Sequence, residues 1–170
     1  MKFKLVPEPP ETAAFVRDVQ AAVPLVPGSE DDCCARLMRR CGFESRDVAR
    51  TWLTFLRAVD LAEETDSGFR RRRVDSDADH LRAALLAGVY GADELAAALL
   101  AADDPLTAAD AFDRFADRVP EWERHRRDDW VAVWRDRVAR LLGWFALLDL
   151  ADRTDDGYVA TDTLRSVHGK

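Results

Sequence analysis

One face of a helix expected over residues 46–60 carries three arginines and a threonine at spacings of four, four and three residues. These residues are Arg46, Arg50, Thr54 and Arg57. Arginine can bind guanine edges or phosphates, and threonine can contact a phosphate or a thymine methyl group, so this face predicts binding to nucleic acid. The alternative is a solvated helix face whose charge is balanced by Asp47 and Asp60.

A second basic group follows closely and is the most concentrated charge on the chain. It consists of Arg70, Arg71, Arg72 and Arg73. The run begins in the second strand of an expected hairpin, where alternation would point Arg71 and Arg73 to one face of the strand. In that position the run predicts contacts with the backbone or minor groove of DNA. The alternative is a strand edge that is ion-paired with the acidic residues 63–64 and thereby protected from aggregation.

No pattern in the sequence supports catalysis or metal binding. Cys33, Cys34 and Cys41 lack the paired spacing and nearby histidines of a zinc site, so we expect buried free thiols, with a redox sensor as the minor alternative. The three histidines are scattered, and the chain contains no glycine-rich phosphate loop, nucleophile elbow or HExxH sequence. We therefore expect that the protein is not an enzyme and that it binds no metal ion and no cofactor.

Both basic groups belong to a stretch that alternates helix and turn signals. Apolar spacing and breakers predict helices over about 12–23, 30–41 and 46–60. Ser29 followed by Asp32 is a capping pattern, and Gly42 is expected to end the second helix. A hairpin is expected over 61–74, with its turn at residues 66–68. Three helices followed by a hairpin is the element order of a winged helix-turn-helix unit, here residues 1–75.

The hairpin sequence occurs twice. Residues 60–69 reappear as residues 149–158, at an offset of 89 and with six of ten positions identical. The copy predicts a second unit over 93–170, with helices at about 93–102, 108–119 and 129–149 and a hairpin at 150–163. Residues 76–92 are expected to form a connecting helix between the two units.

The repeat also allows a comparison of the two copies. Positions 89 residues beyond the first basic face hold one arginine and three small residues, namely Arg135, Ala139, Gly143 and Ala146. The second hairpin likewise lacks an arginine run. We expect the first unit to contact the partner and the second to serve packing or dimerisation. The interface predicted for it comprises Ala139, Gly143, Trp144 and Ala146, whereas most of the other tryptophans are expected in the core.

Composition limits the setting in which these units work. The formal net charge is −7, nearly all basic residues are arginine, and aspartate greatly outnumbers glutamate, which resembles the proteins of salt-loving archaea. At molar salt the Debye length is about 3 Å, so an acidic balance argues only weakly against DNA binding. No apolar run reaches the roughly 20 residues of a membrane span, and the start lacks a signal-peptide core. We therefore expect a cytoplasmic protein.

The duplicated pattern resembles tandem winged-helix proteins of halophilic archaea, over about residues 12–74 and 93–163. This resemblance implies a mainly α-helical fold with small β-hairpins, built from two winged-helix units related by internal duplication. It implies double-stranded DNA as the partner of a transcriptional regulator, with the helix at 46–60 in the major groove. It implies, as the alternative, a protein-interaction module in a larger assembly without direct DNA contact. A homodimer or a protein partner would be held through the second unit.

Overall fold

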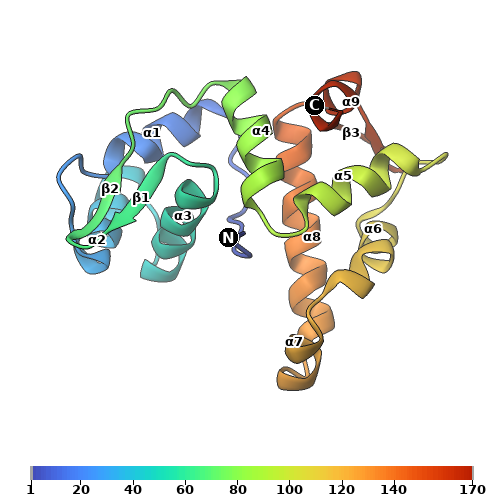
Figure 1. The fold of residues 1–170 in the computed structure, drawn as a ribbon, viewed down its shortest axis with the longest axis horizontal. Helices are drawn as coiled ribbons and strands as arrows, with labels where there is room; N and C mark the ends of the chain where they lie inside the picture. Colours follow the sequence, from blue (N-terminus) through green and yellow to red (C-terminus); the bar gives the residue numbers. More distant parts are fainter. Residues whose placement is uncertain (1, 170) are drawn as a thin grey trace. The chain divides into compact units, whose positions relative to one another are not determined.

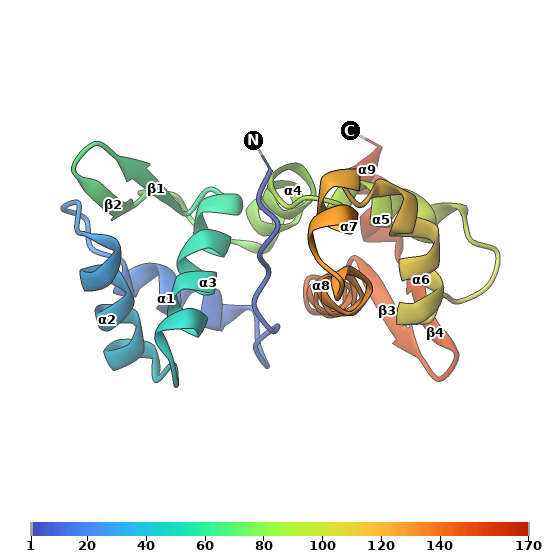
Figure 2. The ribbon, with the colours of Figure 1, turned by 90° about the horizontal axis from the view of Figure 1, so that it is seen from below.

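The computed structural model describes residues 2–169, and the chain divides into two compact units, Met1–Val89 and Tyr90–Lys170. The first unit combines four helices with one antiparallel hairpin (Figures 1 and 2). Its elements are α1 (Ala14–Ala22), α2 (Glu30–Cys41), α3 (Arg46–Ala58), β1 (Ala62–Thr65), β2 (Gly68–Arg71) and α4 (Ala78–Gly88).

The second unit repeats this order with an insertion before its longest helix. A 3₁₀ turn, η1, and the short helix α7 lie between α6 and α8, and α7 lies beside the N-terminal end of α8 (Figure 1). Its elements are α5 (Ala92–Ala101), α6 (Ala108–Phe115), η1 (Ala116–Arg118), α7 (Glu121–Arg126), α8 (Trp130–Leu147), β3 (Ala151–Thr154), β4 (Gly157–Ala160) and α9 (Asp162–His168).

The helix ends follow the capping chemistry expected from the sequence. The Ser29 hydroxyl accepts a hydrogen bond from the Asp32 amide at 3.0 Å, and acidic residues fill the first turn of α2, where the helix dipole favours them. Gly42 ends α2 in the left-handed region, at φ 73°. In the second unit, Thr107 and Asp110 form a reciprocal capping box at the start of α6. The cap predicted at Ser29 and the helix end predicted at Gly42 are confirmed.

The repeated sequence adopts the same conformation in both units. Asp60 and Asp149 follow the long helices with φ of 64° and 61°, in the left-handed region that aspartate tolerates. Each hairpin also gains a third, short strand from the loop before the second helix of its unit. Gly28 bridges Phe69 in the first unit, and Leu106 bridges Tyr158 in the second. The repeat is therefore the scaffold on which each unit is built.

The helix that the sequence predicts as a connection over residues 76–92 is present as α4, but it is not a separate connecting element. Helix α4 instead packs within the first unit, where the His80 ring lies 2.8 Å from the Val59 carbonyl oxygen. The Phe3 amide donates to the Gly88 carbonyl at 2.8 Å, which ties the N-terminal segment to the end of the same helix. Helix α9 follows the second hairpin in the corresponding place, so each unit ends in a helix that the sequence pattern did not assign to it.

The hairpin turn places a glycine where a side chain has no room. Gly68 has φ 127°, and a Cβ built there would lie 2.3 Å from the Gly28 carbonyl oxygen. We expect Gly68→Ala to destabilise the first unit by about 2–4 kcal/mol, since backbone strain and a clash with main chain act together. Urea unfolding measures this loss. The neighbouring exposed change Ser67→Ala is the control, and an equal effect of the two variants would contradict the close approach.

Candidate nucleic-acid interface

The exposed face of α3 carries the first predicted basic group. Ser45 caps the helix by accepting from the Val48 amide at 3.2 Å, and Trp52, Phe55 and Leu56 are buried on the opposite face. Two arginines at the N-terminal end, Arg46 and Arg50, keep about half of their side chains in solvent, at 54% and 50%. Thr54 lies half-buried one turn further on.

Both of these arginines have acidic neighbours within the first unit. Arg46 forms an ion pair with Asp31 of α2, and Arg50 with Asp47, one turn earlier on α3. Each acidic side chain is itself at least 70% exposed. Pairs this exposed contribute roughly 0–1 kcal/mol, so a phosphate can replace the carboxylate at little cost. The face is therefore basic but partly neutralised.

Arg57, the last member of the stripe, is held inward. Its guanidinium lies 3.0 Å from a carboxylate oxygen of Glu64 and within about 5 Å of the Phe3 and Phe69 rings. Only 25% of its side chain is exposed. Because α3 ends against the hairpin, Arg57 connects the helix to β1 and β2 and stabilises the first unit.

Ion pairing also occupies half of the arginine run. Glu63 lies directly opposite Arg70 in the hairpin register, and their side chains approach to 2.6 Å. Arg72 pairs with Asp60 and approaches Glu63 at 4.0 Å. The alternative given by the sequence, an ion-paired strand edge, therefore applies to Arg70 and Arg72. The turn of the hairpin carries Asp66 and Ser67, so its tip is not basic.

The other two arginines of the run, Arg71 and Arg73, line a cavity of about 430 Å³ together with Gln20 and Leu25. The Nε atom of Arg71 is buried without a hydrogen-bond partner, and Arg73 is exposed. The Gln20 amide, which the sequence did not single out, donates to the carbonyls of Arg72 and Val74 at 3.2 and 2.9 Å. Gln20 thus fixes the chain that leaves β2.

The corresponding face of α8 in the second unit is largely uncharged. Arg135 is exposed with its guanidinium 5.4 Å from the centre of the Phe112 ring, Ala139 is exposed, and Gly143 and Ala146 are half-buried. Trp144 is fully buried and presents no ring at the surface of the chain. The proposed interface therefore rests on the three small residues. Trp134 is also buried, as expected for the core, whereas Trp122 is 56% exposed.

A polar contact that the sequence did not reveal holds α7 against α8. Glu123 is only 6% exposed, and its carboxylate accepts from the Trp134 indole nitrogen at 2.7 Å. Arg137 lies 3.9 Å from the same carboxylate, over the Trp134 ring. Burial lowers the pKa of Arg137, whereas Glu123 opposes this effect. Nothing in the sequence indicated that Glu123 would be buried, because it is one of many acidic residues in the chain.

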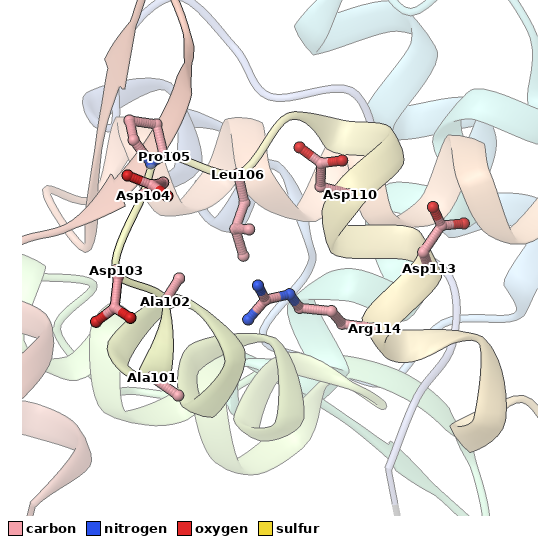
Figure 3. Close-up of a pocket in the computed structure, with 9 residues that line it drawn as sticks. All are labelled: Ala101, Ala102, Asp103, Asp104, Pro105, Leu106, Asp110, Asp113 and Arg114. Carbon is pink, nitrogen blue, oxygen red and sulfur yellow. The ribbon is translucent and has the colours of Figure 1, made fainter.

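The second unit has a cavity of about 470 Å³ between the end of α5 and the side of α6. Figure 3 shows four carboxylates spread around it, with the Arg114 side chain reaching across towards Ala102 and Leu106. The acidic residues are Asp103, Asp104, Asp110 and Asp113. Arg114 and Arg36 occupy equivalent positions, because each follows the capping residue of its helix, Thr107 or Ser29, at the same separation in sequence. Arg36 has a structural role, since it donates to the Ala22 carbonyl at 2.7 Å.

The three cysteines lie in the first unit, Cys33 and Cys34 buried and Cys41 half-buried. Burial, followed by nearby carboxylates, raises the pKa of each thiol. Within residues 2–169, no three histidine, cysteine or acidic side chains are arranged to hold a metal ion. The arrangement therefore gives no sign of an activated thiol.

We expect all three thiols to react with iodoacetamide at least about tenfold more slowly than free cysteine at neutral pH, because a raised pKa leaves less thiolate and burial limits access. The rate of labelling is measured by mass spectrometry of the folded chain over time and compared with the rate for the chain unfolded in urea. Cys41 should react first, since it is the most exposed. One cysteine reacting as fast as a free thiol would restore the redox sensor as an alternative.

Each unit thus presents helices, a short bridging strand and a hairpin in the order that defines a winged helix, and the chain is a tandem winged-helix protein. It belongs to the family described as the Halobacterial double winged helix domain, whose model matches residues 1–165. The predicted fold class and the resemblance are both confirmed.

A search of curated proteins and a search of solved structures found no match. The family suggests a DNA-binding or regulatory role, and winged-helix domains are typically not enzymes. No helix in residues 2–169 is long and apolar enough to cross a bilayer.

Proposed function

We propose that the chain binds double-stranded DNA through its first unit and acts as a transcriptional regulator. The observation that carries this proposal is the difference between the two long helices. Helix α3 exposes Arg46 and Arg50 beside Thr54, whereas α8 has Ala139 and Gly143 at the matching positions of Arg50 and Thr54. In winged helices the third helix is the one that enters the major groove.

Within this proposal the arginines have different tasks. Arg46 and Arg50 exchange Asp31 and Asp47 for phosphates or guanine edges, which costs little because both pairs are exposed. Arg57 keeps the helix in place against the hairpin. Arg70 reaches the DNA backbone only where it releases Glu63, so its share of the binding energy is small.

Retention on immobilised duplex DNA across salt concentrations tests the proposal. Phosphate contacts make the logarithm of the binding constant fall with the logarithm of salt concentration, with a slope of about −0.9 for each phosphate neutralised. Two to three exposed arginines therefore predict a slope of roughly −2 to −3. Circular dichroism at each salt concentration keeps loss of fold separate from loss of binding. No retention while the fold is intact would contradict DNA binding.

A second candidate function is a protein-interaction module. It is favoured by the internal ion pairs of Arg57, Arg70 and Arg72, which reduce the free positive charge of α3 and the hairpin. Retention on DNA that does not change with salt, or no retention at all, would favour this alternative.

A further inference from the structure

Each unit has a loop at the equivalent position before its second helix, and the two loops differ in character: the first is apolar and the second is acidic. Residues 24–28 in the first unit and 102–106 in the second both pair with the hairpin and lead into a capped helix. Gly28 and Leu106 are the bridging residues, and Ser29 and Thr107 are the caps, so the loops are related by an offset of 78 residues. Leu25 and Val26 then correspond to Asp103 and Asp104.

In the first unit this loop forms an apolar and basic edge, which we call the 24–28 edge and define as residues 24–28 with Arg71 and Arg73. Leu25 is 43% exposed and Val26 is 77% exposed, between two prolines that stiffen the loop. The loop is fixed to β2 because the Pro24 carbonyl accepts from the Arg71 amide at 2.8 Å and Gly28 exchanges two hydrogen bonds with Phe69.

The cavity beside this edge is lined mainly by basic and apolar side chains. The Nε atom of Arg71 is buried and unsatisfied, and within residues 2–169 no acidic side chain pairs with Arg73. Asp75, which also lines the cavity, is 3.8 Å from Arg17. Leu25 and Val74 supply apolar walls. An occupant that fits must therefore carry negative charge and cover apolar surface as well.

The equivalent loop of the second unit has this composition. The 101–106 loop, by which we mean residues 102–106 together with the last residue of α5, combines the carboxylates of Asp103 and Asp104 with Ala101, Ala102 and Pro105 (Figure 3). Both aspartates are exposed, and neither pairs with a basic group in the described part of the chain. Residues 91–170 carry 11 basic and 17 acidic residues, a net charge of −6, against 14 and 15 over residues 1–90.

From this match we infer that the 24–28 edge binds the 101–106 loop of a second copy of the chain. Asp103 and Asp104 pair with Arg71 and Arg73, and the small apolar residues of the loop cover Leu25 and Val26. A DNA phosphate would satisfy the charges but would leave the apolar residues in water, so a protein loop fits better. Because the two surfaces differ, the contact is head-to-tail and produces a closed ring or an open chain of copies.

This contact uses a different surface from the proposed DNA interface. Arg46 and Arg50 on α3 are not part of the 24–28 edge, and Arg71 and Arg73 are not part of the α3 face. The inference therefore does not rest on DNA binding. Self-association and DNA retention can be measured on the same variants, and either one can fail alone.

Sedimentation velocity of the full chain over a range of concentrations tests the inference. We expect the average mass of the wild-type chain to rise with concentration. Arg73→Glu and Asp103→Arg/Asp104→Arg should each raise the apparent dissociation constant at least about tenfold, because each places like charges together. Val26→Asp, on the apolar part of the edge, should do the same. All of these positions are exposed, and circular dichroism confirms that each variant is folded.

A mixing experiment distinguishes a head-to-tail contact from other modes of association. Arg73→Glu keeps an intact 101–106 loop, and Asp103→Arg/Asp104→Arg keeps an intact 24–28 edge. Mixing the two deficient variants should restore the contact between the intact loop of one and the intact edge of the other, and yield complexes that contain both variants. A wild-type chain that stays monomeric throughout, or a mixture that shows no complex, would overturn the inference. Loss of DNA retention with unchanged association in Arg73→Glu would overturn it as well, since the edge would then face DNA.

Discussion

Glu123→Ala is expected to lower the free energy of unfolding of the second unit by about 3 kcal/mol. Removing one partner of a buried ion pair costs about 3–5 kcal/mol because the other charge stays buried without compensation. The lower end of this range applies because Arg137 keeps 21% of its side chain in solvent. The change also leaves the Trp134 indole N–H without its 2.7 Å acceptor inside the core.

Tryptophan fluorescence during urea unfolding measures this effect, since Trp134 is itself a reporter. Glu123→Gln should lose about half as much, because its amide oxygen still accepts from Trp134 although the charge facing Arg137 is gone. Glu121→Ala, on the exposed side of the same helix, is the matched control and should lie within about 0.5 kcal/mol of wild type. If the two alanine variants unfolded alike, the buried carboxylate would contribute nothing particular.

The same contact explains why the second unit departs from the first. Trp134 packs against Phe115 and Tyr90 at centroid distances of 5.6 and 5.7 Å, and Glu123 satisfies its polar edge. Helix α7 supplies that glutamate, and in the first unit no helix lies between α2 and α3 to correspond to α7. The insertion thus serves the core of the second unit.

Local features of the fold were predictable because they depend on neighbours in sequence. The caps at Ser29 and Thr107 and the left-handed Gly42 all follow from residue chemistry over three or four positions. Helix α7 was not predicted, since six residues after a proline carry too little periodicity to be recognised. Helix α9 was missed for the same reason, with seven residues and one fully buried leucine.

The candidate site was less predictable, because its charges depend on contacts between elements. Spacing alone placed Arg46 and Arg50 on an exposed face of α3. It did not predict that Asp31, on another helix, would pair with Arg46, or that Arg57 would turn towards the hairpin. The loops at 24–28 and 102–106 were not recognised as equivalent because the offset there is 78 rather than 89. The insertion between α6 and α8 increases the offset in residue number between equivalent positions of the two units.

Arg50→Glu is expected to weaken retention on duplex DNA by about 10- to 100-fold at low salt. A good arginine contact to a base or phosphate is worth about 1–3 kcal/mol, and reversal of the charge adds repulsion. The salt dependence should also become less steep by about one unit, since one phosphate fewer is neutralised. A new glutamate beside Asp47 costs the helix only a few tenths of a kcal/mol, so the fold should persist.

The duplication supplies the matched control. Arg46→Glu and Arg135→Glu change arginines at equivalent positions of α3 and α8, both exposed. We expect the first change to reduce DNA retention as Arg50→Glu does, and the second to leave it within about twofold of wild type, since surface changes away from a contact have small effects. Equal losses for the pair would mean that net charge, rather than the α3 face, governs binding. The opposite order would move the DNA-binding surface to the second unit.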